Sequence, residues 1–201
     1  LTGAYVKGWR GTSQLTFDEK TTVEHLAPDL LPTLAEMENQ GPVPIGSFIG
    51  GGGQMDVTVE AALIEVKPGS GLVMRCPDCK RVLQQDMCRL HGKQAGTPDL
   101  RIKAVMDDGT GAVSTIFSKE LTESILGRTM AEFTAIAKEA MTPDVVEAEA
   151  RLKLTARTLR VRGNVLVDEF GPMLLAKEAM FVQRDLAAAA EALLAELEGV
   201  A

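Results

Sequence analysis

The chain has 201 residues, of which 45% are hydrophobic and 24% are charged. This composition is typical of a globular protein and excludes a disordered chain, and no apolar run reaches the roughly 20 residues that cross a bilayer. The net charge of −7 argues, taken alone, against a nucleic-acid partner. The charge is uneven, however: residues 71–104 carry a net +4 and residues 151–163 a net +5. We therefore expect one cationic face.

The N-terminal third predicts a hairpin followed by a connector. Residues 3–17 have the pattern of a strand, a glycine-containing turn and a second strand. A lone hairpin is barely stable in water, and the chain starts with Leu1, so we expect residues 1–27 to be the last strands of a truncated preceding domain. Residues 28–53 contain four prolines and a glycine run and predict a linker. The glycine run is not a phosphate loop, because no Lys-Ser/Thr follows it.

All three cysteines fall in one cluster with a histidine. The spacing is Cys76-x2-Cys79 and, eight residues later, Cys88-x2-His91. Two such pairs on tight turns can place four sulfur and nitrogen donors around one tetrahedral Zn²⁺ ion. Four protein ligands leave no open position for water, so we expect one structural zinc ion in a ribbon spanning residues 71–98. Disulfides are disfavoured because three cysteines cannot all pair, and an ordinary surface role for His91 is the alternative.

Residues 54–182 show the patterns of five strands, with helices between the third and the fourth. Strands are predicted at residues 56–67, 99–107, 112–118, 159–168 and 173–182, and helices at residues 118–127, 129–141 and 142–154. Five strands with helices between the third and fourth form the order of the OB-fold, a small Greek-key barrel. We therefore predict a mainly β protein with helices: a five-stranded OB barrel at residues 54–182, with the zinc ribbon inserted between its first two strands.

Alternation along these strands predicts which side chains face outward. Arg101 and Lys103 lie opposite the aliphatic face of the second strand, and Arg160 and Arg162 project in the same way from the fourth. In the third strand one of the two adjacent apolar residues Ile116 and Phe117 must point away from the core. Each arginine could equally be an ordinary solvated charge, and Phe117 could be a core residue.

The C-terminal segment, residues 183–201, predicts a helix with an apolar stripe. The stripe and the small residues beside it comprise Leu186, Ala190, Leu193, Leu194 and Leu197. A barrel of this size does not need such a stripe. We expect the helix to join a bundle with partner helices, and packing against its own domain is the alternative.

The residues around the cysteine cluster resemble a known family. The run CPDCKRVLQQDMCRLHGKQAGTPDLRIKAVMDDGTGAVSTIFSKELTESILG, residues 76–127, resembles the zinc-containing OB domain of the large subunit of replication protein A. It is most similar to archaeal versions, in which the fourth ligand is histidine and the ribbon is short. Residues 159–176, LRVRGNVLVDEFGPMLLA, fit the last two strands of that domain. Residues 6–15, VKGWRGTSQL, resemble the end of the preceding OB domain.

The resemblance implies a sequence-nonspecific single-stranded DNA-binding protein of replication, repair and recombination. In this family aromatic side chains stack on bases, and the matching positions are Phe117, Phe170 and, in the preceding domain, Trp9. The basic residues expected to contact DNA are Arg101, Lys103, Lys119, Arg160 and Arg162. The C-terminal helix is expected to join other subunits in a three-helix bundle, as a hetero- or homotrimer. Replication enzymes such as primase or polymerase are further expected partners, and a membrane is not. The resemblance implies an intracellular protein, located in the cytoplasm or nucleoid if it is archaeal.

Other functions remain open at this stage. An enzyme is disfavoured because His25 is the only histidine outside the cluster and no cysteine is left over, so no nucleophile–base set is visible. An assembly module that holds subunits together with little DNA binding of its own is the main alternative. RNA binding cannot be separated from DNA binding, because an OB face accepts either strand.

Overall fold

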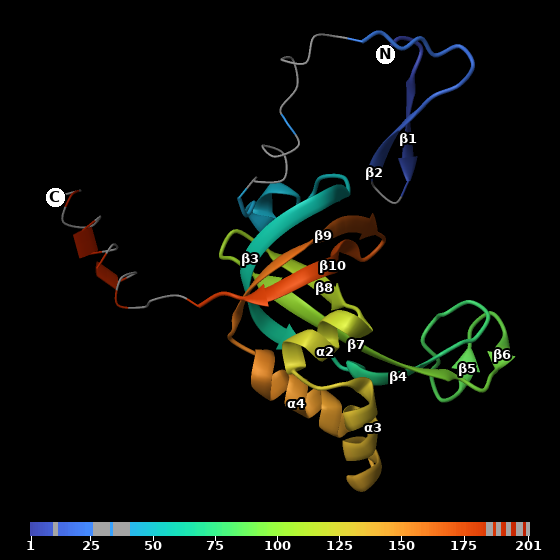
Figure 1. Cartoon of the computed structure of the whole chain (residues 1–201), viewed down its shortest axis with the longest axis vertical. Coiled ribbons are helices and arrows are strands. Elements are labelled where there is room, and N and C mark those ends of the chain that lie inside the picture. Colours follow the sequence, from blue (N-terminus) through green and yellow to red (C-terminus); the bar gives the residue numbers. More distant parts are fainter. Residues whose placement is uncertain are drawn as a thin grey trace.

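The structure is a computed structural model that describes residues 1–9, 12–25, 33 and 41–183, together with residues 187, 190, 191, 194, 195 and 199. It contains an N-terminal hairpin and a larger β-domain with helices at one end (Figure 1). Within these ranges, no helix is long and apolar enough to cross a membrane.

The predicted N-terminal hairpin is confirmed. Strands β1 (Tyr5–Trp9) and β2 (Thr12–Thr16) pair antiparallel, with Val6 opposite Leu15. These two side chains are 65% and 51% exposed. The hairpin therefore displays apolar surface that a core would normally cover. Its assignment to a preceding barrel stays a prediction.

Five strands of the large domain pair in a ring, and each of them matches a predicted strand. They are β3 (Gln54–Val66), β7 (Thr97–Asp107), β8 (Ala112–Phe117), β9 (Thr158–Asp168) and β10 (Gly171–Phe181). The pairing runs β3–β9–β10–β8–β7 and returns from β7 to β3. Every pair in the ring is antiparallel except β10 with β8. This order, with helices between β8 and β9, confirms the predicted mainly β fold of OB-fold type.

The inside of the ring is aliphatic because alternate strand residues point inward. In β8, for example, Val113, Thr115 and Phe117 are buried, while their neighbours are at least partly exposed. Residues with no exposed surface inside the domain include Val59, Leu63, Leu100, Ile102, Phe117, Val161 and Leu174. Burial of each such side chain contributes about 1.5–3 kcal/mol, which makes this cluster the main source of stability.

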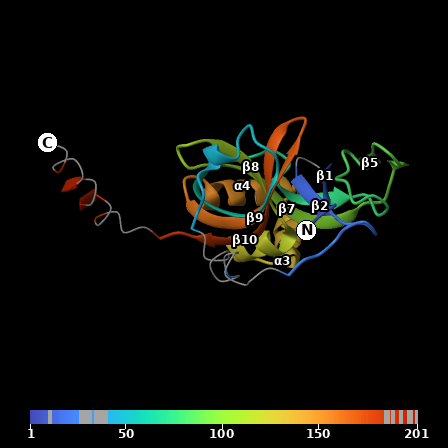
Figure 2. The same cartoon turned by 90° about the horizontal axis from the view of Figure 1, so that it is seen from above.

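An additional strand supports the ribbon. β4 (Gly71–Arg75) pairs with the first half of β7, from Arg101 back to Thr97. The sequence predicts that all of residues 71–98 belong to the ribbon. In the structure residues 71–75 instead form β4, which extends the sheet along β7. The ribbon itself contains only the short pair β5 (Met87–Cys88) and β6 (Gly92–Lys93). It projects to one side of the β-domain (Figure 2).

The three predicted helices are confirmed with small changes at their ends. α2 (Lys119–Leu126) is capped by Ser118 and ends at Gly127, whose φ of 69° suits glycine. α3 (Met130–Glu139) begins with a capping box between Thr129 and Glu132.

α4 (Asp144–Leu154) starts next to Pro143, and the Thr142 hydroxyl accepts a hydrogen bond from the Asp144 N–H at 3.2 Å. Pro143 has helical dihedrals, so Thr142 acts as the cap, as predicted. Figure 1 shows α4 at the lower end of the domain, where it packs beside β3 and β4.

Part of the predicted linker belongs to the domain. The 3₁₀ turn η2 (Ile45–Ser47) places Ile45 in the core with no exposed surface, and Phe48 is 2% exposed. The Asp108 carboxylate accepts a hydrogen bond from the Ile45 N–H at 2.7 Å, which fixes this turn to the β7–β8 loop. Composition predicts residues 28–53 as a linker outside the domain, but Ile45 and Phe48, which follow the last proline of the segment, pack into the core of the domain.

Candidate nucleic-acid interface and metal centre

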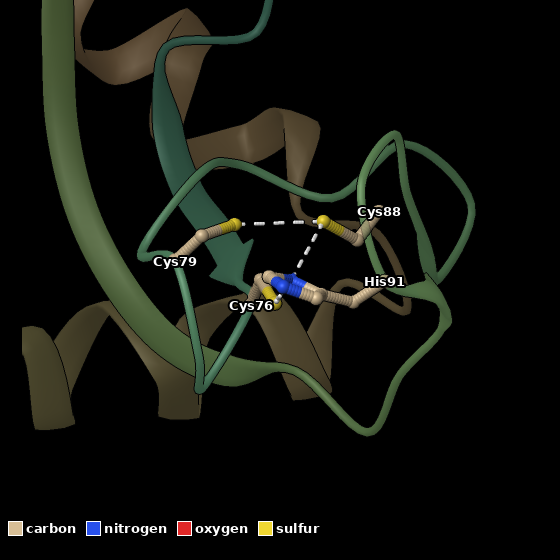
Figure 3. A group of neighbouring side chains, drawn as sticks. All are labelled: Cys76, Cys79, Cys88 and His91. Carbon is tan, nitrogen blue, oxygen red and sulfur yellow. Dashed lines mark hydrogen bonds between the residues drawn. The ribbon is translucent and has the colours of Figure 1, made fainter.

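The four predicted metal ligands lie together at the start of the ribbon (Figure 3). The Sγ atoms of Cys79 and Cys88 are 3.5 Å apart, and the Nδ1 atom of His91 lies 3.4 Å from Cys76 Sγ and 3.7 Å from Cys88 Sγ. In a tetrahedral zinc site with metal–sulfur bonds of about 2.3 Å, neighbouring ligand atoms lie about 3.8 Å apart. The observed separations fit such a centre, so these residues could hold a metal ion through three sulfurs and Nδ1.

The cysteines of the cluster differ in how readily they form the thiolate that a metal requires: although the Arg81 N–H lowers the pKa of Cys79, burial and hydrogen bonds with Cys88 and Cys76 raise it overall. The Cys76 carbonyl accepts a hydrogen bond from the Lys80 N–H at 2.9 Å, which closes the first turn, and Lys80 has a φ of 59°. At the second turn the N–H groups of Leu90 and His91 lower the pKa of the Cys88 thiol to about 6, although burial raises it. A thiolate is the ligand form, so the low pKa of Cys88 makes it the thiol most readily available to a metal near neutral pH.

Phe170 is presented to solvent, and its stacking on a base stays a prediction. It lies on the tight turn between β9 and β10 and is 88% exposed. Its N–H donates to the Asp168 carboxylate at 2.8 Å, and Gly171 follows with a φ of 104° that permits the turn. The loop is therefore shaped by its neighbours, while the ring itself contacts little.

Phe117 is not available for stacking, and the prediction for this residue is wrong. Its side chain has no exposed surface and lies in the core, with Ile102 opposite it on β7. The alternation of β8 turns Ile116 outward instead. The sequence left both orientations open because two large apolar residues are adjacent, and only the phase of the strand decides between them.

A largely apolar face on the outer side of the sheet spans three strands. The sequence analysis did not predict it. On β7, β8 and β10 it is formed by Lys103, Val105, Ser114, Ile116, Met173 and Leu175, all partly exposed. Two rows cross the sheet: Lys103–Ile116–Leu175 and Val105–Ser114–Met173. Alternation in the predicted strands is the signal that could have found this face. We call these six residues the β7–β8–β10 face.

Basic residues at one edge of this face are only partly exposed. Arg101 and Lys103 follow alternate positions of β7, and Lys119 begins α2 next to the end of β8. Burial, followed by the nearby charge of Arg75, lowers the pKa of Arg101, whereas Asp99 raises it. The arginine nevertheless stays charged, because its ordinary pKa lies far above neutral pH.

Arg160 and Arg162 lie elsewhere and are already paired. Arg160 on β9 forms an ion pair with Glu60 on β3 at 2.9 Å, and Arg162 pairs with Asp56 at 2.7 Å and with Glu178 at 3.9 Å. In the ring, β9 is separated from β7 by β3 on one side and by β10 and β8 on the other. These arginines therefore do not form one cationic face with Arg101 and Lys103, which corrects the charge pattern expected from sequence.

The other predicted site residues lie largely outside the described side chains. Trp9 is the last residue of β1, but its side chain is outside the description. Leu186, Leu193 and Leu197 of the predicted interface helix are outside the described residues as well. The two that are described, Ala190 and Leu194, are in helical conformation and exposed, with Leu194 at 57%.

The strands pair in a ring and follow each other in the order of an OB-fold, which defines an OB-type domain. Three cysteines and one histidine cluster between its first two strands, β3 and β7, and form a possible metal site. No family model and no curated protein sequence matches the chain. Among solved structures it is similar to "Structure and Conformational Change of a Replication Protein A Heterotrimer Bound to ssDNA", at 19% identity and a TM-score of 0.42. It is also similar to "Yeast RPA bound to ssDNA", at 13% identity and a TM-score of 0.43.

The extent of these similarities differs. The first covers 71% of this chain but only 35% of the other, and the second covers 89% of this chain and 100% of the other. The chain thus spans about a third of the length of the first protein. With TM-scores below 0.5, these similarities do not themselves define the fold, which rests on the strand pairing described above.

Proposed function

We propose that this chain binds single-stranded DNA without sequence preference, as part of a replication protein A large subunit of archaeal type. OB-folds bind oligonucleotides on the face of their second and third strands, between the loop joining strands one and two and the loop joining strands four and five. In this chain those parts are the β7–β8–β10 face, the ribbon and the turn that carries Phe170. The exposed ring of Phe170 on that turn is the observation that carries the proposal.

The chemistry of this face suits bases of any identity. Every base has a flat aromatic surface, so a ring such as Phe170 stacks on all four, with about 1–3 kcal/mol per base. Aliphatic side chains such as Ile116 and Leu175 offer apolar contact without hydrogen bonds that would select a base. Lys103 at the end of one row supplies a positive charge for the phosphates.

The wider role follows from the family resemblance. We propose that the chain acts in replication, repair and recombination, that Cys76, Cys79, Cys88 and His91 hold one structural zinc ion, and that it catalyses no reaction. The hairpin would be the end of a preceding OB domain. The C-terminal helix would assemble with other subunits in a hetero- or homotrimer, and primase or polymerase would be further partners.

The test is fluorescence anisotropy with labelled oligo-dT and the zinc-loaded chain. Phe170→Ala is expected to weaken binding about tenfold, within the range of one lost stacking contact. Phe181→Ala is the matched control, because Phe181 is 44% exposed but lies at the other end of β10. Equal affinities for wild type and Phe170→Ala would remove the observation on which the proposal rests.

An assembly module with little DNA binding is the second candidate. It is favoured by the burial of Phe117, the ion pairs of Arg160 and Arg162, and the exposed Leu194 on the C-terminal segment. This function predicts no oligo-dT affinity even at low salt. It also predicts that partner subunits co-purify with the chain and are lost when residues 184–200 are removed.

A further inference from the structure

A hollow lies at the end of the domain away from Phe170, between the last residues of α2 and α4 and the last residues of β10. Its volume is about 460 Å³, and it is lined by residues 124–127, 153, 157, 158 and 181–183. The apolar part of the lining comes from Ile125, Leu126, Phe181 and Val182, and Phe181 is 44% exposed. A half-exposed aromatic residue at the edge of a hollow is typical of a surface that a partner covers. We call these lining residues the α2–β10 hollow.

Positive charge predominates at the rim of this hollow. The Glu149 carboxylate on α4 pairs with two cations, Arg128 at 3.3 Å and Lys153 at 2.8 Å. Lys153 also donates a hydrogen bond to the Leu126 carbonyl at 2.9 Å, which holds its ammonium group at the hollow. Arg157 is exposed and has no carboxylate partner within the part of the chain that the structure describes. Three cations against one carboxylate leave this group with a net charge of +2, which favours an acidic partner.

The C-terminal segment of the chain has the complementary composition. Residues 184–201 carry a net charge of −3, from one base and four acids: Arg184, Asp185, Glu191, Glu196 and Glu198. Leu193 and Leu197 are four positions apart, the spacing at which two side chains meet on one face of a helix. An amphipathic helix binds an apolar groove through residues at this spacing. The segment therefore matches the α2–β10 hollow in both its apolar and its charged parts.

A second copy of the chain is the source of this segment that the geometry favours. The segment starts directly after Gln183, which itself lines the hollow, so it would have to reverse direction at once to enter the hollow of its own chain. Its described positions are exposed and so are not packed against their own domain: Ala187, Ala190, Glu191, Leu194 and Ala195. As a helix, its 18 residues extend about 27 Å, far enough to reach a neighbouring molecule. Every copy carries both surfaces, so the contact is head-to-tail, the kind that builds a ring of subunits.

We propose that the α2–β10 hollow is the docking site for residues 184–201 of a second copy of this chain. Leu193 and Leu197 of one copy pack against Phe181 of the next, and the acids of the segment face Arg157 and Lys153. This inference rests on the subunit assembly in the proposed function and deepens it: the partner is an identical chain, and its helix binds a domain rather than only other helices.

The first experiment is carbodiimide cross-linking, which joins an amine directly to a carboxylate in contact with it. Unlabelled and isotope-labelled chains are mixed in urea, refolded with zinc, cross-linked, digested and analysed by mass spectrometry. We expect products that join Lys153 of one copy to an acid of residues 184–201 of another, so that one peptide is labelled and the other is not. The product of Lys153 with Glu149 on the same helix is the internal control, because it shows that the reagent reaches Lys153.

The cross-links separate this inference from the proposed function. Products of Lys153 with residues 184–201 only within single chains would show that the segment covers its own hollow, which overturns the inference. A Lys153–Glu149 product without any product to residues 184–201 overturns it as well. If the chain then still sediments as an oligomer, assembly through the C-terminal helix stands. If it sediments as a monomer, the assembly of identical chains fails too, and oligo-dT binding is tested independently of both.

The second experiment is sedimentation velocity of the zinc-loaded full chain at low salt. Arg157→Glu is expected to weaken self-association about tenfold, because an attraction becomes a repulsion. Combining it with Glu191→Lys, Glu196→Lys and Glu198→Lys exchanges the charges and should restore association. Lys138→Glu is the matched control, because Lys138 is an exposed lysine in the last turn of α3 and undergoes the same charge change. Equal association of Arg157→Glu and Lys138→Glu refutes the docking site, and the wild-type cross-links keep the test valid should a variant fail to fold.

Discussion

Phe117→Ala and Phe170→Ala should separate stability from DNA binding, because the two rings have opposite environments. A phenylalanine side chain offers about 200 Å² of apolar surface. Phe117 has none of it exposed, so at about 25 cal/mol per Å² its removal costs about 5 kcal/mol, close to the range of about 3–5 kcal/mol for Phe→Ala in protein cores. Phe170 is 88% exposed, and the same arithmetic predicts a loss of only about 0.6 kcal/mol.

Urea unfolding of the zinc-loaded chain, followed by circular dichroism, measures both free energies of unfolding. We expect Phe117→Ala to lower the midpoint strongly with little change in slope, and to keep its oligo-dT affinity under conditions where it remains folded. Phe170→Ala should keep a urea midpoint close to that of wild type but bind oligo-dT more weakly. The reasoning fails if Phe117→Ala unfolds like wild type yet loses DNA affinity, since that ring would then lie at the surface.

Three further predictions concern the lock on η2, a buried hydroxyl and the metal. Burial raises the pKa of Asp108, but hydrogen bonds from Ile45 and Thr110 outweigh it and lower the pKa overall. Its stabilising effect should be complete above the unfolded-state pKa of about 4 and be lost as the pH falls through the lower folded value. Asp108→Asn should therefore reduce the urea midpoint near neutral pH and converge with wild type in acid; a constant difference would contradict this. Thr115→Val should stabilise the chain by about 1 kcal/mol, because the Thr115 hydroxyl is buried with no described partner; a lower midpoint would instead indicate a bound water. A strong chelator should release one zinc ion and remove amide protection from residues 76–96 while β7 beyond Leu100 stays protected, since the ribbon packs as a separate small cluster. Loss of protection throughout the barrel would show that the two parts unfold together.

The strands and helices were predictable because their signals are local. Alternation places β7 and β9 within one or two residues of the predicted bounds, and the caps at Ser118, Thr142 and Gly127 mark helix ends by their own hydrogen bonds or dihedrals. β4 was not predictable in the same way. Its five residues carry no strong pattern, and they form a strand because the first half of β7 offers an unpaired edge.

The candidate site shows the same division. The two Cys/His pairs could be assigned from spacing alone, because two-residue separations bring ligands together within a single turn. The roles of Arg160 and Arg162 could not be, because their partners Asp56 and Glu60 lie about a hundred positions earlier in the chain. The local sequence around an arginine does not indicate whether its side chain pairs with a carboxylate in the folded protein or faces solvent.

What the sequence alone determined is therefore the order of elements, the candidate metal ligands and the place of an aromatic residue on the β9–β10 turn. Each depends on residues within a few positions of one another. Only the tertiary structure decided that Phe117, Ile45 and Phe48 lie in the core of the domain. It also decided that the Nε–H of Arg101 is buried with no hydrogen-bond partner among the described residues. These outcomes depend on which face of each strand points inward and on contacts between segments far apart in the chain. Both are fixed when the strands pair in a ring, and local sequence patterns carry no information on them.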